Sequence, residues 1–268
     1  MDISSYHQEN RAAWDITAAK YEADEQEDIA FLRAGGNALL PPEQAALGDL
    51  SGWCARAVHL QCAAGLETLS LLRQGAREVT GIDISERMTA SARRKTAALA
   101  LNAHWHCCDV LAAPAELDGT ADLVHTGRGA LLWMMDLDAW AAVAARLLKP
   151  GGRLHIFEGH PLDRVWDTGA AEYRLDPRRG DYFQAEPGQG EIWPRPFLDH
   201  QQEVEPASLH PHDRQWTLAQ VINSVIRAGL RVEFFEEYPI PFWNQFPHIP
   251  DDLLRRLPHT FTLLARKE

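Results

Sequence analysis

The chain has 268 residues, of which 46% are hydrophobic, and its formal net charge is −12. This length fits one α/β domain with an inserted or appended cap, and the hydrophobic content suffices for a full core. The negative charge argues against a nucleic-acid-binding protein, because such proteins need a basic surface for the phosphate backbone. We find no apolar run long enough to span a bilayer and no signal peptide, so we expect no membrane partner.

The four cysteines indicate a reducing compartment. Cys54, Cys62, Cys107 and Cys108 form no C-x-x-C pair, and Cys62 and Cys107 fall on predicted inner strands. We therefore expect free thiols in a cytoplasmic protein, with neither disulfides nor a zinc site. The run His210-x-His212-Asp213 also suggests a metal site, but a proline between two histidines in a polar loop is weak evidence. We predict no metal.

The first 50 residues are predicted to be mainly helical. Trp14, Ala18 and Tyr21 recur at helical spacing, which is typical of a packing face. The pattern predicts helices over 4–22, 29–34 and 41–48, an acidic break over 24–28 and a flexible turn at Gly35-Gly36.

A strand, a turn and a helix follow at Ala57 to Gln74. Val58 and Leu60 form a short apolar run, as in a buried parallel strand. Ala63, Ala64 and Gly65 are small, where the backbone must turn tightly into a helix beside a ligand. The next strand ends at Asp83, about twenty residues after the turn, where a carboxylate can accept both hydroxyls of a ribose.

The turn favours one of two cofactor classes. Dinucleotide enzymes need G-x-G-x-x-G, because a diphosphate must contact bare backbone. Here the matching positions are Gln61, Ala63 and Leu66, so all three glycines are missing. S-adenosylmethionine (SAM) has no phosphate and makes weaker demands, so the turn favours SAM over a nicotinamide cofactor.

These residues resemble a known family. The run His59-Leu-Gln-Cys-Ala-Ala-Gly65, with Thr68-Leu-Ser-Leu71 and Val79-Thr-Gly-Ile-Asp-Ile-Ser85, is similar to class I SAM-dependent methyltransferases. It is closest to a bacterial small-molecule subgroup with H-L-Q-C in place of D-L-G-C. The departures from the family pattern are His59, Gln61 and Ala63. The resemblance implies a Rossmann-like seven-stranded sheet, mostly parallel with the last strand antiparallel, and helices on both faces.

The resemblance also implies a cofactor site. The N-terminal helices would close over the SAM pocket as a lid, with Tyr21 and the Gly35-Gly36 turn near the methionine end. Met88 would lie over the nucleotide, and Asp109 would accept a hydrogen bond from the adenine amino group. The predicted cofactor residues are Tyr21, Gly36, Gln61, Cys62, Ala63, Gly65, Asp83, Ile84, Met88, Asp109, Val110, Thr126 and Gly127.

The second half of the chain carries the expected substrate region. We predict strands over 103–108, 121–126 and 153–157, a helix capped by Asp138, and a Lys149-Pro-Gly-Gly152 turn. Residues 162–214 are rich in Pro, Gly and aromatics, and a loop this long indicates a substrate cap. Thr217-x-x-Gln220 is a capping box, and strands over 231–238 and 259–266 would form an antiparallel hairpin. The predicted units are a lid (1–50), a SAM-binding core (51–161), the cap (162–214) and a completing segment (215–268).

The predicted reaction is methyl transfer (EC 2.1.1) from SAM, which becomes S-adenosylhomocysteine (SAH). The acceptor would be an O or N atom of a small, aromatic or heterocyclic molecule. His160 and Glu158 follow the fifth strand and are the candidate bases, with His125 next. Glu158 could instead cap a helix, and His125 or His155 could be satisfied core histidines. The candidate substrate residues are Arg128, Trp133, Trp193 and Trp243.

Two other functions stay open. One is a non-catalytic SAM-binding protein, because His59 and Gln61 depart from the family pattern. The other is a nicotinamide-dependent oxidoreductase on the same scaffold. The sequence does not distinguish a monomer from a homodimer.

Overall fold

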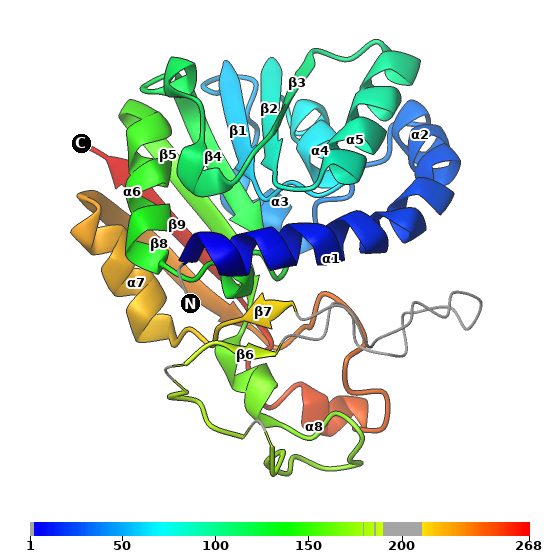
Figure 1. Cartoon of the computed structure of the whole chain (residues 1–268), viewed down its shortest axis with the longest axis vertical. Helices are drawn as coiled ribbons and strands as arrows, with labels where there is room; N and C mark the ends of the chain where they lie inside the picture. The colour runs from blue at the N-terminus through cyan, green and yellow to red at the C-terminus, as the bar shows by residue number, and fades with distance from the viewer. Residues whose placement is uncertain (1–2, 179, 185, 190–210) are drawn as a thin grey trace.

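A seven-stranded sheet forms the centre of the molecule (Figure 1). The computed structural model describes residues 3–178, 180–184, 186–189 and 211–268. Within them the strand order is β3-β2-β1-β4-β5-β9-β8. Strands β1 to β5 are parallel, β9 is antiparallel to β5, and β8 is antiparallel to β9. The bounds are β1 Arg56–Leu60, β2 Glu78–Asp83, β3 Ala103–Cys107, β4 Ala121–Gly127, β5 Leu148–Gly159, β8 Leu230–Tyr238 and β9 Thr260–Lys267. The predicted fold class is confirmed.

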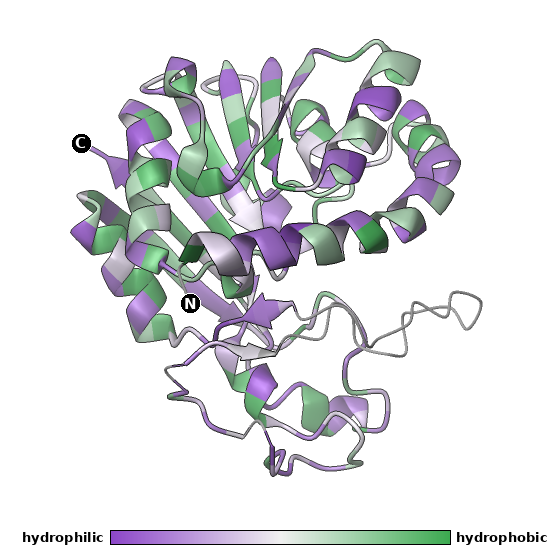
Figure 2. Ribbon diagram, in the orientation of Figure 1, coloured by the Kyte–Doolittle hydropathy of each residue, from purple (hydrophilic) through white to green (hydrophobic). Residues whose placement is uncertain are grey.

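Helices cover both faces of this sheet. They are α1 Ile3–Ala23, α2 Glu25–Arg33, α3 Pro41–Leu47, α4 Leu66–Arg73, α5 Glu86–Leu99, α6 Leu137–Leu147, α7 Leu218–Arg227 and α8 Asp251–Leu254. Short 3₁₀ turns lie at η1 Val110–Ala112, η2 Ala115–Leu117, η3 Leu131–Trp133 and η4 Pro161–Val165. Most helices carry both hydrophilic and hydrophobic residues, as amphipathic helices on a sheet do (Figure 2). Among the described residues no helix is both long and apolar enough to cross a membrane.

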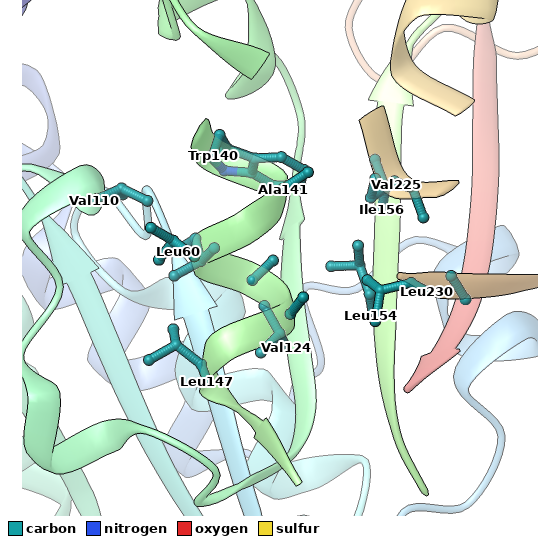
Figure 3. Close-up of a cluster of buried hydrophobic side chains, with 14 of the residues drawn as sticks. Leu60, Val110, Val124, Trp140, Ala141, Leu147, Leu154, Ile156, Val225 and Leu230 are labelled. Atoms are coloured by element: carbon teal, nitrogen blue, oxygen red, sulfur yellow. The ribbon is translucent and has the colours of Figure 1, made fainter. Parts of the chain in front are cut away.

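The core has two layers because strand residues alternate between the faces. Val58 and Val124 belong to a cluster with Trp140, whereas their neighbours Ala57 and Leu123 belong to a second cluster on the other face. Figure 3 shows the first cluster, in which side chains of α6 and α7 meet those of β1, β4 and β5. These apolar layers fix the strand ends on which the polar side chains described below are mounted.

The N-terminal helices dock on α5 through buried charges. Glu25 pairs with Arg94 at 2.8 Å and Asp28 pairs with Lys95 at 2.6 Å, and the Lys95 side chain has no exposed surface. The expected break over 24–28 is therefore wrong, because α2 begins at Glu25 and its acidic residues bind α5. Figure 1 shows α1 running across the molecule, between the sheet and the part that contains β6 (Gly188–Gln189), β7 (His212–Asp213) and α8.

Two boundaries also differ from the prediction. Asp136, not Asp138, caps α6, because its Oδ1 accepts the Ala139 N–H at 2.9 Å. The predicted turn over 149–152 is a bulge inside β5: Ala121 pairs with Leu148 and Leu123 pairs with Arg153. One β4 residue thus faces four β5 residues, so the strand begins earlier than expected.

The described part of segment 162–214 has little regular structure. It holds most of η4, a bridge between Trp166 and Leu175, and the two-stranded sheet of β6 Gly188–Gln189 and β7 His212–Asp213. Trp193 and His210 lie outside the described residues. The capping box at Thr217 and the β8–β9 hairpin are confirmed. The division into four units stays a prediction.

Candidate active site

A cavity of about 170 Å³ lies at the carboxyl ends of β1, β2 and β4. Parallel α/β sheets bind ligands at this edge. The cavity is lined by ten of the predicted cofactor residues: Tyr21, Gln61, Cys62, Ala63, Asp83, Ile84, Met88, Asp109, Val110 and Gly127. His7, Asn10 and Trp14 of α1 line it as well. The structure therefore brings together segments that are far apart in the sequence.

Three predicted cofactor residues do not line this cavity. A Cβ on Gly65 would lie 2.3 Å from Trp105, so this glycine allows α4 to pack closely. A Cβ on Gly36 would meet Phe31 at 2.5 Å. Thr126 is buried and its hydroxyl donates to the Leu60 carbonyl at 3.1 Å. The visible role of all three is packing.

The turn after β1 alternates left-handed residues. Gln61, Ala63 and Gly65 have φ of 57°, 45° and 80°. Side chains in this region crowd the backbone, which is why glycine is usual there. The Gln61 Nε2 donates to the Ala130 carbonyl at 2.6 Å, but its buried Oε1 has no partner among the described residues. The turn thus presents an unused acceptor on a residue that lines the cavity.

Asp83 ties the turn to β2. Its Oδ2 accepts the Ala63 N–H at 2.8 Å and its Oδ1 accepts the Ser85 N–H at 2.9 Å. Burial raises the pKa of the Asp83 carboxyl to about 6, although these two hydrogen bonds lower it. Each oxygen keeps a free lone pair, so the carboxylate can accept further hydrogen bonds from a ligand.

Asp109 joins the cavity floor to α1. Its Oδ2 lies 2.5 Å from Nδ1 of His7, and its Oδ1 accepts the Leu111 N–H at 2.9 Å. Burial would raise the pKa of Asp109, but the hydrogen bonds from His7 and Leu111 outweigh it and lower that pKa. A single ring of α1 thus touches the carboxylate at the end of β3.

Three histidines line up across the sheet beside this cavity. His59 pairs with His125, and His125 with His155, on neighbouring strands. The Nδ1 atoms of His125 and His155 are 2.8 Å apart, so one ring donates and the other accepts. Burial lowers the pKa of His59 to about 4 and that of His155 to about 3, which keeps these rings neutral. His125 and His155 are buried, but His125 lines the cavity and the buried Nε2 of His155 has no partner among the described residues, so the choice between core histidines and site residues stays a prediction.

A second cavity of about 610 Å³ adjoins the first. Five residues line both: Trp14, Tyr21, Arg128, Gly129 and Trp133. Five of the predicted catalytic and substrate residues line the second cavity: Arg128, Trp133, Glu158, His160 and Trp243. Arg128 has φ of 58° and pairs with Glu67 at 2.8 Å and with Glu43 at 2.5 Å, so its charge is compensated within the protein.

Glu158 holds the loop after β4. Its carboxylate accepts backbone N–H bonds from Gly129, Ala130, Leu131 and Gly159, at 2.6 to 3.1 Å. Burial raises its pKa despite these bonds. Four backbone donors fill the four lone-pair positions of a carboxylate, so Glu158 has no acceptor position left for a substrate.

His160 forms a pair with Glu237. Its Nε2 lies 2.7 Å from the Glu237 Oε1, and its Nδ1 accepts the Leu162 N–H at 3.1 Å. Burial lowers the pKa of His160, and Glu237 opposes this effect. The ring is therefore oriented through both nitrogens.

A second histidine–carboxylate pair, which was not predicted from the sequence, also lines this cavity. His259 Nδ1 lies 2.7 Å from the Asp163 Oδ1, while its Nε2 contacts the Leu254 carbonyl at 2.8 Å and the Tyr173 hydroxyl at 3.0 Å. Burial raises the pKa of Asp163 to about 6, and Asp163 raises the pKa of His259 against the effect of burial. Asp163 and His259 are 96 positions apart, so no local pattern marks the pair.

The four cysteines are free thiols. Within the described residues no group of three or more His, Cys, Asp or Glu side chains could hold a metal ion. His212 of the suspected metal run lies 2.7 Å from Glu9, and Asp213 pairs with Arg164 at 2.7 Å.

Comparisons with known proteins agree with this geometry. Residues 57–152 match the model of a family described as a methyltransferase domain. No curated protein matches the chain. A SAM-dependent methyltransferase from Mesorhizobium loti has 22% identity and a TM-score of 0.59, over 84% of this chain and 96% of that one.

The geranyl diphosphate C-methyltransferase of Streptomyces coelicolor A3(2), solved with Mg²⁺, geranyl diphosphate and SAH, has 16% identity and a TM-score of 0.57, over 91% of this chain and 83% of that one. At these identities the likeness concerns the fold. The chain therefore has the fold of SAM-dependent methyltransferases, and residues 57–152 of it match a methyltransferase domain.

Proposed function

We propose that the protein is a SAM-dependent methyltransferase that acts on a small molecule. The observation that carries this proposal is the position of Asp83, whose carboxylate lines the first cavity and accepts a hydrogen bond from the Ala63 N–H. A second, larger cavity adjoins the first and leaves room for an acceptor. A ribose needs such a carboxylate at the end of β2. The match of residues 57–152 to a methyltransferase domain supports the same reading.

The residues of the first cavity fit SAM. The unpartnered Oε1 of Gln61 can accept a hydrogen bond from an ammonium group, as the methionine part of SAM carries. Asp83 would hold the ribose hydroxyls, and Asp109 the adenine amino group in competition with His7. The other predicted cofactor residues of the cavity, Met88 among them, supply mostly apolar or backbone surface.

When bound, SAM supplies a methyl group that its sulfonium already activates for in-line displacement. The task of the chain is then to align the acceptor and exclude water. The aromatic rings of Trp14, Tyr21 and Trp133 line both cavities, where they can cover the reacting atoms and attract a cation.

We assign different roles to the two predicted catalytic residues. His160 stays the candidate base: its lowered pKa favours a neutral imidazole, and Glu237 can stabilise the ring once it gains a proton. To take that proton, Nδ1 has to exchange the Leu162 N–H for the hydroxyl or amine of the acceptor. Glu158 is a positioning residue, since its carboxylate fixes the loop that carries Gly129 and Leu131. Trp133 and Trp243 would contact the acceptor, and Trp193 stays a prediction from the sequence.

Calorimetry tests the cofactor assignment. We expect SAM and SAH to bind the wild-type protein and NADH not to bind, and we expect Asp83→Ala to weaken SAM binding about ten- to a hundredfold by loss of charge-assisted hydrogen bonds. Asp49→Ala is the matched control, because Asp49 is an exposed carboxylate whose hydrogen bonds, within the described part of the chain, go to Ser51 alone. Binding of NADH in preference to SAM would refute the proposal.

The catalytic part needs a separate experiment. Methyl transfer from labelled SAM to a panel of small aromatic and heterocyclic nucleophiles should give a product, and His160→Ala should lower turnover while SAM affinity is unchanged. Tight SAM binding without transfer to any member of the panel would favour a non-catalytic SAM-binding protein.

A further inference from the structure

We propose that the methyl acceptor carries an anionic group, a carboxylate or a phosphate, and that Arg214 in the second cavity binds it. This inference rests on the proposed function, and it concerns a residue that the sequence did not single out. Its basis is a guanidinium group that the protein fixes in place but leaves without a carboxylate partner.

The Arg214 side chain is held firmly. Its backbone N–H donates to the Leu132 carbonyl at 2.8 Å and its Nη1 donates to the Met135 carbonyl at 2.9 Å. Its guanidinium carbon lies 4.2 Å from the centre of the Trp216 ring, whose Nε1 donates to the Met134 carbonyl at 3.0 Å. Stacking on an aromatic ring fixes the guanidinium plane, so little entropy remains to be lost on binding a ligand.

The charge of Arg214 is not compensated. The three other arginines that line the cavity have acidic partners: Arg128 pairs with Glu43 and Glu67, Arg164 with Asp213, and Arg178 with Asp176. Among the residues that the structure describes, no carboxylate lies within 4.0 Å of Arg214 and its buried Nε has no acceptor. The Nε–H and one Nη–H of a guanidinium point the same way, so this edge is shaped for two oxygens of one anion.

Two other residues of this cavity also carry a polar atom without a partner among the described residues. The buried Oε1 of Gln215 has no donor, and its amide orientation is fixed because Nε2 donates to the Pro161 carbonyl at 2.8 Å. The buried Nε1 of Trp166 has no acceptor among the described residues. Both residues line the same cavity as Arg214. Unpaired buried polar atoms are costly, and all three belong to residues that line this cavity, as expected of a site that a polar ligand completes.

The acidic side chains of the cavity have partners within the protein. Glu158 is surrounded by four backbone N–H groups, Asp163 is bound by His259 and Gln245, and Asp213 by Arg164. The cavity also contains an apolar part, where the rings of Phe242 and Trp243 pack edge to face with their centres 4.2 Å apart. The expected acceptor is therefore a small acid with a flat apolar body and a hydroxyl or amino donor for Gln215.

Binding to the SAH-loaded protein tests the proposal. The probes are matched sets on one ring: hydroxybenzoic acids, their primary amides and the corresponding hydroxyphenyl phosphates, measured by calorimetry and by transfer from labelled SAM. We expect the anions to bind at least about tenfold more tightly than the amides. A preference between carboxylates and phosphates identifies which anion the site takes.

The variants separate the role of Arg214 from a general effect on folding. Arg214→Gln should remove the preference for anions, with SAH affinity unchanged, and Arg214→Lys should restore part of it because the charge returns without the fork. Arg178→Gln is the matched control, since Arg178 lines the same cavity but has an acidic partner.

Equal binding of acids and amides, or an Arg214→Gln variant that weakens both equally, would overturn the proposal, as would a panel in which no anion binds the SAH-loaded protein. A wild-type protein that does not bind SAH would instead overturn the proposed function.

Discussion

At Gln61 and Ala63 the backbone is left-handed although neither residue is a glycine. Such a residue costs about 1 kcal/mol or more, because its Cβ crowds the neighbouring carbonyl. The bond from the Ala63 N–H to Asp83 helps to hold this conformation. The missing glycines of the turn are therefore seen in the structure as strain, and the turn keeps its shape.

Replacing Ala63 by glycine should relieve this strain. We expect Ala63→Gly to raise the free energy of unfolding by roughly 0.5–1 kcal/mol, the strain relieved less the extra entropy of the unfolded chain. Urea denaturation measures the change. Ala64→Gly is the control, because Ala64 is buried and has no positive φ, so this variant should be destabilised. A loss of stability in Ala63→Gly would contradict the prediction.

Asp83 should make SAM binding depend on pH. Its pKa is raised to about 6, above the value in the unfolded chain, so its protonated form is favoured by folding. The stability that this group contributes is present at low pH and is lost as the pH rises through about 6.

The pH dependence of SAM binding has the opposite sign, because a ribose needs the ionised carboxylate. Affinity measured by calorimetry should be constant above pH 7 and fall below about pH 6, by up to about tenfold per pH unit. Asp83→Asn should bind weakly with no such step, and a step of equal size in this variant would assign the titration to another group.

At the scale of elements, α2 is bound to α5 by charged residues whose sequence pattern is typical of a solvent-exposed surface. Lys95 follows two arginines in a basic run of α5, yet its side chain is completely buried and bonded to Asp28. Burial raises the pKa of Asp28, and the bond from Lys95 opposes this effect. Asp28 and Lys95 are 67 positions apart, so neither the acidic run nor the basic run predicts this pair by itself.

Replacing one member of this pair should destabilise the protein more than replacing both. Asp28→Asn leaves the buried Lys95 ammonium without its anion, which we expect to cost about 3–5 kcal/mol in free energy of unfolding. The double variant Asp28→Asn/Lys95→Met should recover a large part of that loss. Urea denaturation of both variants and of Lys95→Met measures the coupling, and strictly additive effects would show that the pair is not coupled.

For the whole molecule, the sheet could be predicted because its signals are local. Val58, Leu60 and Asp83 lie in one strand–turn–helix–strand unit, and the family resemblance extends the pattern to the remaining strands. The first cavity is built at the ends of these strands, which is why most of its predicted residues line it.

The second cavity was harder to predict because its walls come from loops. Asp163 contacts His259, which is 96 positions away in the sequence, and Arg128 contacts Glu43, which is 85 positions away. Arg214 shows no pattern in the sequence, since what sets it apart is the absence of a carboxylate partner among the described residues. Periodicity and motifs report neighbours along the chain and carry no information on such contacts.

Trp14 and Tyr21 both belong to α1 and border both cavities, the two compartments of the site. A molecule in either compartment therefore acts on the same rigid body. If a guest in one shifts the position of α1, it changes the free energy of occupying the other, and linkage requires that the effect be equal in both directions. Donor and acceptor are then cooperative partners, although neither has to touch the other before the transfer.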